Sequence, residues 1–301
     1  MIYQLGPTLD GMARRVDRVG ALSATAAMVA LGGSFAVTPL LLAYPVYAGQ
    51  AIRYAVAAAI LTTVAHVNAR GQKAVTPREL GGLVALALTG LAVFNVALIE
   101  GLRLLEPATM GAVVGASPIA LSTLGPLIEG RRLSYRLVLA ALVAVAGSTL
   151  TYGAGPASGR GLVFALVALA GESSFSLIAV PLLPSLGPLV LSAYVTGLAS
   201  IMLAVAAVAV APARPFPLPG FGEAMALAYL ALVVTAFAFL AWYTGVERLG
   251  AARAGLFVAL LPVASALGAA ALGTGILTVA QVVGTSLVAL GLVVGSASTP
   301  A

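Results

Sequence analysis

The chain has 301 residues, of which 61% are hydrophobic and 8% are charged, against about 25% charged residues in a soluble globular domain. This composition cannot form a water-facing surface. The chain has no cysteine and one histidine, His66, which excludes disulfides, thiolate metal sites and histidine-based catalytic or metal sites. We therefore expect no metal and no cofactor.

Apolar runs long enough to cross the membrane as α-helices fill the chain, since about 20 residues cross about 30 Å of hydrocarbon. Ten runs are expected near 19–42, 44–66, 80–102, 107–128, 135–153, 160–182, 187–211, 222–246, 250–272 and 279–297. The first run follows three arginines, as in a signal peptide, but it is too long for a signal h-region, so we expect it to remain as a span. The sequence predicts an all-α polytopic membrane protein.

Lys and Arg residues are distributed unevenly between the connections. If the amino terminus is inside, the outer side receives only Arg103, Arg160 and Arg214. The cytoplasmic side then receives Arg14, Arg15, Arg18, Arg70, Lys73, Arg78, Arg131, Arg132, Arg136, Arg248 and Arg253. Because short cytoplasmic loops are enriched in Lys and Arg, both termini are expected to be cytoplasmic, in the inner (plasma) membrane. The net charge of +6 follows this topology and indicates no nucleic-acid partner.

The stretch 101–147 recurs at 245–291, at a constant offset of 144 residues. The matched identities include three glycine pairs and the pair Pro118/Pro262. Glycine and proline set backbone geometry, so their recurrence favours a duplication over chance similarity of composition.

The duplication predicts two repeats, residues 1–153 and 154–301, with five spans in each. Because five is odd, the second repeat must enter the membrane in the opposite orientation. Such a 5+5 inverted-topology repeat is typical of secondary transporters, which move substrate through a site near the bilayer midplane.

Several short motifs resemble the EamA-type helix pair of the drug/metabolite transporter superfamily. In the first copy they are Gly101, Leu105, Pro107, Ala108, Ser117-Pro118, the loop 130–134 and Gly147, and in the second Gly245, Leu249, Ala251, Pro262, Leu277-Thr278 and Gly291. Arg53-Tyr54 and the segment 32–35 are similar to the family's second-span and first-span motifs. The resemblance implies a non-enzymatic exporter of small organic molecules, similar to the aromatic and other amino-acid exporters. The chain departs from the pattern at Arg131 and Gly275, where the family has glutamate, and at Glu172, where relatives often have an aromatic residue.

Glu172 is the clearest candidate for chemistry, because it lies about halfway along the span 160–182. A charge within hydrocarbon costs about 2.5–3.5 kcal/mol, so it needs a partner, a watery cavity or a function. Phe175 and Ser176 follow on the same helical face. The carboxylate could bind a substrate ammonium or carry a coupled proton. The alternative is a structural ion pair or a hydrogen-bonded acid.

Arg53 is the natural partner to test, with Gln50 one turn earlier in the outer half of its span. A guanidinium binds a carboxylate bidentately, so Arg53 either holds a substrate carboxylate or forms a stabilising pair with Glu172 or Glu100. Glu100 is itself expected to form an exposed helical pair with Arg103.

Asn95 and Phe239 are equivalent positions of the two repeats and would give a cavity one polar and one aromatic wall. For Asn95, a hydrogen bond between helices is the alternative. The predicted substrate-binding residues are Met28, Phe35, Arg53, Asn95, Glu172, Phe175 and Phe239.

Pro118 and Pro262 interrupt equivalent spans. Proline kinks a helix, so the two residues act either as hinges for alternating access or as static bends. Trp242-Tyr243 lies near the cytoplasmic end of the span 222–246 and is expected to be an interface anchor.

Together these features predict a secondary transporter that exports small amphipathic metabolites, with amino acids as the favoured class. Its partners would be the substrate and the lipid bilayer, with protons as a candidate coupling ion, and it would act as a monomer or homodimer. Two alternatives remain, an exporter of lipophilic cations and a membrane scaffold subunit without transport activity.

Overall fold

The computed structural model describes residues 17–41, 43–67, 74–152, 158–271 and 278–296. Within these ranges every regular element is a helix, as the sequence predicts. Six residues used in the sequence arguments, Arg14, Arg15, Arg70, Lys73, Gly275 and Leu277, lie outside the described residues.

Interrupted helices make up most of the first half of the chain. The elements are α2 (Arg18–Gly32), α3 (Ser34–Val37), η1 (Thr38–Leu41), α4 (Val46–Val67), α5 (Pro77–Leu86), η2 (Ala87–Val93), α6 (Phe94–Leu102), α7 (Pro107–Val114), α8 (Ser117–Ile128) and α9 (Tyr135–Tyr152). α5, η2 and α6 form one continuous helical stretch, Pro77–Leu102.

The helices of the second half are interrupted in the same way. Its elements are α10 (Gly159–Leu177), α11 (Leu183–Val210), α12 (Phe221–Tyr229), η3 (Leu230–Phe237), α13 (Ala238–Leu249), α14 (Ala251–Leu256), η4 (Phe257–Ala259), α15 (Leu260–Ala271) and α16 (Val279–Ser296). The proline-rich segment 212–219 leaves the helix between α11 and α12, as expected for residues without an amide donor.

Seven helical stretches among the described residues are long and apolar enough to cross a membrane. The shorter apolar helices α2, α9 and α16 accompany them. α2 ends at Gly32, within the predicted span 19–42, because the helix is broken at Gly33; the rest of the span continues as α3 and η1. The protein is therefore a multi-pass membrane protein.

Irregular segments occur at equivalent places in the two halves. η2 and η3 are π-helices, and a shift of 144 residues places Ala87–Val93 of η2 within Leu230–Phe237 of η3. The break between α7 and α8, at Gly115-Ala116, falls by the same shift where η4 meets α15. Pro118 and Pro262 predicted the breaks before α8 and α15, whereas no sequence pattern that we recognised predicted the π-helices.

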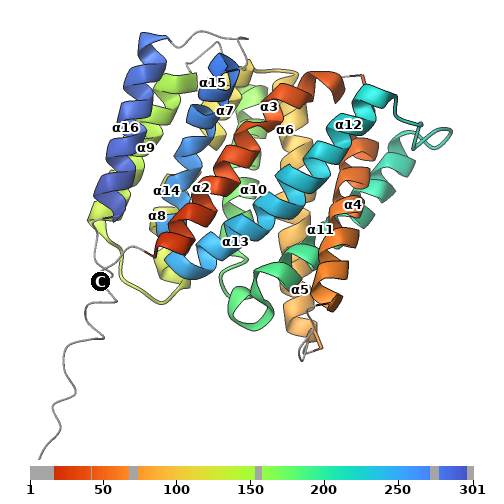
Figure 1. Ribbon diagram of the computed structural model, residues 1–301, viewed down its shortest axis with the longest axis horizontal. Coiled ribbons are helices and arrows are strands. Elements are labelled where there is room, and N and C mark those ends of the chain that lie inside the picture. The colour runs from red at the N-terminus through yellow and green to blue at the C-terminus, as the bar shows by residue number, and fades with distance from the viewer. Residues whose placement is uncertain (1–16, 42, 68–73, 153–157, 272–277, 297–301) are drawn as a thin grey trace, which may run out of the picture.

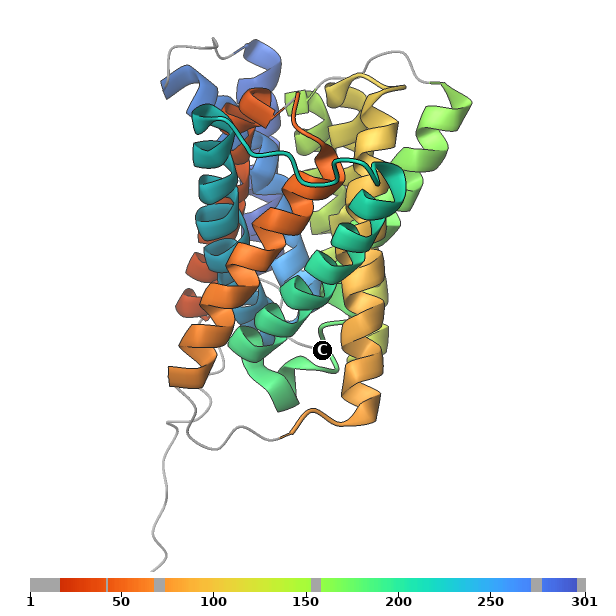
Figure 2. The same cartoon turned by 90° about the vertical axis from the view of Figure 1, so that its right-hand side faces the viewer.

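The main helix pairs each join one half of the chain to the other. α9 packs on α16, α4 on α11, α2 on α13, α6 on α10 and α8 on α14. Figure 1 shows α9 and α16 paired at one margin of the bundle, and Figure 2 shows α4 and α11 crossing at the opposite side. The first four of these pairs are unchanged as a set when the two halves are exchanged, which is what a duplicated chain leads us to expect.

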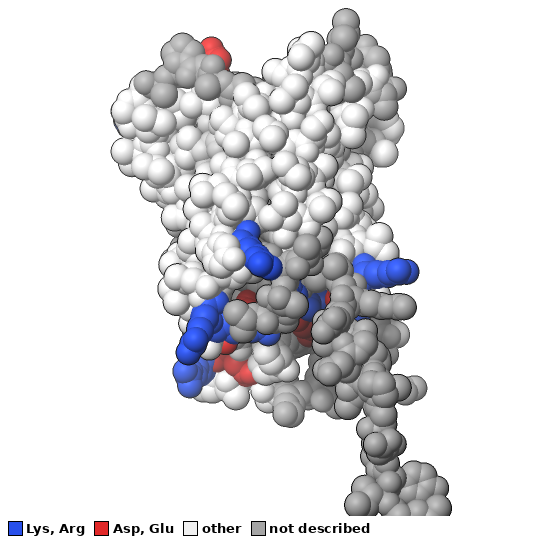
Figure 3. Space-filling model, turned by 90° about the vertical axis from the view of Figure 1, so that its left-hand side faces the viewer, with Lys and Arg blue, Asp and Glu red and all other residues white. Residues whose placement is uncertain are grey.

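Basic side chains gather toward one end of the molecule on the face seen in Figure 3. At this end Arg248 Nη1 lies 3.1 Å from Asp17 Oδ2, so the end of α13 meets the start of α2. The backbone N–H of Ala251 also donates to Glu129 Oε1 at 2.8 Å, which joins α14 to the end of α8. We call this the arginine-rich end, and both contacts join the two halves.

Candidate functional site

Four aromatic rings from α4, α10 and α13 meet between the two halves of the chain. The ring centroid of Phe175 lies 4.8 Å from that of Phe239 and 4.8 Å from that of Tyr243. Tyr54 follows at 6.3 Å from Phe239. All four are buried in the main hydrophobic core at separations that favour tilted ring pairs. This aromatic cluster brings two predicted site residues, Phe175 and Phe239, into contact.

Arg53 lies at the edge of the aromatic cluster. Its guanidinium carbon is 5.2 Å from the ring centroid of Tyr54, a cation–π geometry. Nε donates to Thr235 Oγ1 of η3 at 2.6 Å, and Nη1 donates to Gln50 Oε1 at 3.2 Å. The predicted proximity of Gln50 is confirmed, whereas Thr235 was not among the residues that the sequence singled out.

Asn95 lies just after η2 and is buried. Its Nδ2 donates to the Tyr54 hydroxyl at 3.0 Å and to the Leu91 carbonyl at 2.7 Å. The amide therefore bonds between helices, which was one of the two predicted roles, and it fixes the Tyr54 ring beside Arg53. Its repeat counterpart, Phe239, supplies the facing aromatic wall.

Glu172 lies one turn before Phe175 on α10 and is half-buried. Its charge is within electrostatic reach of the Tyr243 hydroxyl. Within the described ranges it has no ion-pair or hydrogen-bond partner. Glu172 thus places an ionisable carboxyl group at the border of the aromatic cluster, with no cation beside it among the described residues.

A structural ion pair with Glu172 or Glu100, one of the two roles considered for Arg53, is not formed among the described residues. Thr235 and Gln50 hold the guanidinium beside Tyr54. Glu100 instead pairs with Arg103 at 3.7 Å, as expected. Arg53 and Glu172 therefore have no charged partner among the described residues.

Two candidates from the first span are only partly placed. Met28 is buried in the same core as Phe175 and Phe239. Phe35 lies in α3, and its side chain is outside the part of the chain that the structure describes. Gly32, at the end of α2, faces Ala264 of α15, because a Cβ at Gly32 would meet the Ala264 Cβ.

Trp242 and Tyr243 are not interface anchors, contrary to the sequence prediction. Their exposed fractions are 3% and 0%. Trp242 Nε1 donates to Ser176 Oγ at 3.0 Å, and the Tyr243 hydroxyl donates to the Phe175 carbonyl at 3.4 Å. Both polar groups find partners on α10, so these amphipathic rings can be buried between helices rather than placed at the lipid surface.

Pro118 and Pro262 both lie in the first turn of a helix, α8 and α15, directly after a break. Proline is tolerated in a first turn because the N–H that it lacks has no intrahelical partner there. Their equivalent placement is compatible with either predicted role, hinge or static bend.

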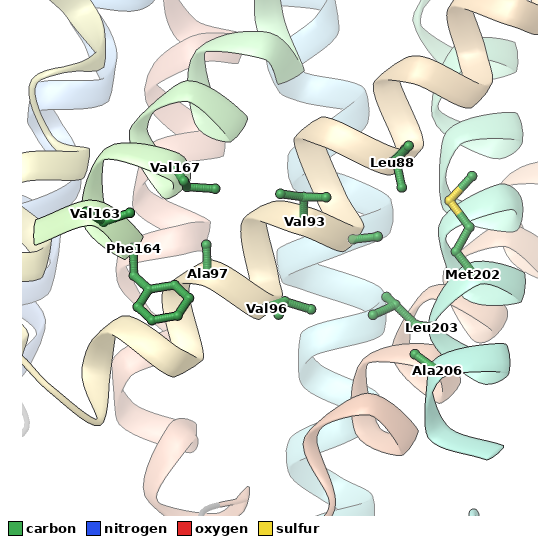
Figure 4. A pocket seen from close by; sticks show the side chains of 11 residues that line it. Leu88, Val93, Val96, Ala97, Val163, Phe164, Val167, Met202, Leu203 and Ala206 are labelled. Carbon is green, nitrogen blue, oxygen red and sulfur yellow. The ribbon is translucent and has the colours of Figure 1, made fainter. Parts of the chain in front are cut away.

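An apolar groove of about 400 Å³ lies apart from the aromatic cluster, between α10 and α11 with η2 and α6 beneath it (Figure 4). Its lining contains only apolar side chains, among them Val93, Phe164 and Met202. Exposed Val163 and Val167 at its border place it on the outer surface of the bundle. No predicted site residue lines the groove. Because its lining is apolar, the groove does not suit a charged substrate.

Comparison with known proteins finds a transporter family and relatives that are named as transporters. The model of the EamA-like transporter family matches residues 18–153 and again residues 159–296. The chain is 25% identical over 252 residues to the "Uncharacterized transporter YetK" of Bacillus subtilis (strain 168), covering 81% of this chain and 76% of that one. An "Uncharacterized transporter" of Archaeoglobus fulgidus is 24% identical, with 80% and 85% covered. A solved structure titled "Crystal structure of protein" aligns with a TM-score of 0.76 at 20% identity, covering 91% of this chain and 95% of that one, which shows a shared fold.

Proposed function

This chain belongs to the EamA-like transporter family, and on that premise we propose that it exports small amphipathic metabolites, with amino acids as the substrate class. Family membership and its transporter relatives make it a multi-pass membrane transporter rather than an enzyme. The substrate, the direction of transport and the coupling are parts of the proposal.

One observation carries the proposal. Arg53 and Glu172 have opposite charges, lie within spans and have no charged partner among the described residues. The aromatic cluster links them through Tyr54, Phe239 and Phe175. Unpaired charges in hydrocarbon are costly, so a ligand that supplies both counter-charges is favoured. A zwitterion with an apolar side chain offers a carboxylate to Arg53, an ammonium to Glu172 and an apolar surface to the rings.

For the transport cycle we propose alternating access between two inverted repeats, 1–153 and 154–301, each with five spans. Both termini are placed in the cytoplasm and the protein in the inner membrane, since the arginine-rich end then faces inward. The contacts that join the halves at that end, Asp17–Arg248 and Glu129–Ala251, would open when the site faces the cytoplasm. Pro118 and Pro262 serve as hinges in this cycle.

Purified protein in proteoliposomes tests the substrate class. We expect saturable uptake of apolar and aromatic amino acids that is competed by other zwitterions. Amino-acid amides lack the carboxylate and N-acetylated amino acids lack the ammonium, so both should compete at least about tenfold less well, a loss of about 1.4 kcal/mol for a charge-assisted contact. A pH gradient of either sign, with a no-gradient control, separates passive from proton-coupled flux.

An exporter of lipophilic cations is the second candidate, favoured by the position of Glu172 beside aromatic rings, since ring faces attract cations. Competition by lipophilic cations but not by amino acids would select it and overturn the amino-acid proposal. If no amino acid or cation moves, the scaffold alternative is favoured.

A further inference from the structure

Thr235 has a defined place beside the proposed substrate site. It lies in the π-helix η3 with an exposed fraction of 0%, and its Oγ1 accepts the 2.6 Å hydrogen bond from Arg53 Nε. We propose that Thr235 is a positioning residue that orients the Arg53 guanidinium for a substrate carboxylate. This inference rests on the proposed function, in which Arg53 binds that carboxylate.

The direction of the hydrogen bonds is fixed. The Thr235 hydroxyl donates its one hydrogen to the Leu230 carbonyl at 2.9 Å. It can therefore only accept from Arg53, whose guanidinium can only donate. The chain from Arg53 through Thr235 to Leu230 ties α4 of the first half to η3 of the second half in one orientation.

This orientation leaves one edge of the guanidinium available. Of its five N–H groups, Nε bonds to Thr235 and one on Nη1 bonds to Gln50. The remaining N–H groups, on Nη1 and Nη2, have no partner among the described residues. Because a carboxylate binds two neighbouring N–H groups of a guanidinium, the edge formed by Nη1 and Nη2 is the one offered to the substrate.

The π-helical backbone explains why Thr235 can do this. The hydroxyls of Thr63, Thr196 and Thr244 in α-helices bond to the carbonyl four residues earlier, the usual arrangement in a helix. Thr89, near the start of the π-helix η2, keeps this arrangement and bonds to Ala85 of α5. Thr235 bonds to the carbonyl five residues earlier, in step with the π-helix. Single-turn π segments occur often at functional sites. At the matched position of η2 stands Leu91, whose carbonyl holds Asn95.

Three variants test the inference in proteoliposomes. Thr235→Val keeps the shape but removes the hydroxyl, Thr235→Ser keeps the hydroxyl, and Thr244→Val is the matched control, because the Thr244 hydroxyl bonds only within its own helix, to Leu240. For an amino acid, T235V should raise KM about tenfold with kcat within about twofold of wild type, T235S should restore KM, and T244V should behave as wild type. Transport of the amino-acid amide should not change. An unaltered KM in folded T235V, or equal losses for acid and amide, would overturn the inference.

A second measurement separates this inference from the proposed function. If the wild-type protein transports no carboxylate compound, the proposed substrate is wrong, but the orientation of Arg53 can still be tested. With ¹⁵N-arginine labelling in detergent, the Nε–H of Arg53, assigned through Arg53→Lys, should give a slowly exchanging signal. The signal should be lost in T235V and kept in T235S and T244V. Its survival in T235V would show that Thr235 does not position Arg53.

Discussion

The carboxylate of Glu129, the residue after α8, accepts a 2.8 Å hydrogen bond from the backbone N–H of Ala251, the first residue of α14. A residue of the first repeat thus caps a helix of the second, where the helix dipole favours negative charge. Gly250 permits the approach, because it has φ +77° and a Cβ there would lie 3.0 Å from the Glu129 oxygens. Arg131 lies 3.5 Å from the same carboxylate and partly balances its charge.

Removing this cap should destabilise the fold. We expect Glu129→Ala to lower the free energy of unfolding by about 1–2 kcal/mol and Glu129→Gln, which keeps an acceptor, by about half of that. Glu106→Ala is the matched control, because Glu106 precedes α7 without a capping hydrogen bond and its loss should cost less than about 0.5 kcal/mol. Thermal unfolding in detergent measures the difference. Equal effects at both glutamates would contradict the capping role.

Acidification should weaken the Asp17–Arg248 contact. The Gly20 amide and the Arg248 guanidinium hold the pKa of Asp17 below its usual value, against the opposing effect of burial. A lowered pKa in the folded state gives stability that is present above the unfolded pKa of about 3.9 and is lost as the pH falls through the folded pKa. Melting temperatures of wild type and Asp17→Asn should therefore differ near neutral pH and converge below about pH 4. The difference should be only tenths of a kcal/mol, because the pair is exposed. A difference independent of pH would rule out the linkage.

The all-helical membrane fold and its duplication could be predicted from the sequence because long apolar runs and recurring glycine and proline residues act locally. The run boundaries agree with the helix ends within a few residues for most elements, for example α4 against 44–66 and α16 against 279–297. The first span was the exception. Its break at Gly33 involves Tyr229 of the second half, whose hydroxyl lies where a Gly33 Cβ would be.

The candidate site was predictable in its members but not in their contacts. Glu172, Arg53 and Asn95 stood out because polar groups within apolar runs are costly. Thr235 did not, because a threonine can bond to its own helix and needs no partner. Its contact with Arg53 depends on the π-helix η3 and on the packing of α4 against it. Both are consequences of tertiary packing that one sequence does not show.

Close packing of α10 on η2 should make Gly171 intolerant of a side chain. A Cβ there would lie 2.9 Å from the Thr89 carbonyl oxygen and 2.9 Å from the Phe94 Cβ. Gly171→Ala should therefore cost about 1–3 kcal/mol through overpacking. Gly81→Ala should have the opposite sign, about 0.5–1 kcal/mol stabilising, because this exposed helical glycine has no atom within 4 Å of a new Cβ. Thermal unfolding of the two variants in parallel checks the sign, and a stable G171A would contradict the observed packing.

The hinge role of Pro118 and Pro262 predicts an effect on rate rather than on affinity. If the breaks before α8 and α15 must bend in each cycle, the double variant Pro118→Ala, Pro262→Ala should lower kcat several-fold, by up to about 1.4 kcal/mol in barrier height, and leave KM unchanged. Pro126→Ala is the control, because Pro126 lies inside α8 away from the break. Proteoliposome kinetics would distinguish the roles, since static bends would leave kcat at the wild-type value.

Glu172 is the residue on which proton coupling would depend. It is the one carboxylate placed beside the aromatic cluster among the described residues, and no cation there holds it in the charged form. If it carries the coupled proton, Glu172→Gln should abolish accumulation driven by a pH gradient, because glutamine cannot release a proton. Exchange down a substrate gradient should persist with a raised KM, because glutamine also lacks the charge that binds the substrate ammonium. Glu100→Gln should keep full coupling, since Glu100 lies in the Arg103 pair. The measurement is uptake by proteoliposomes over pH 5–8, with and without a gradient.

An E172Q protein that retains the full rate and pH dependence would exclude Glu172 as the proton carrier. Uptake that does not depend on pH even in the wild type would instead make transport passive and leave the carboxylate only the substrate ammonium to bind.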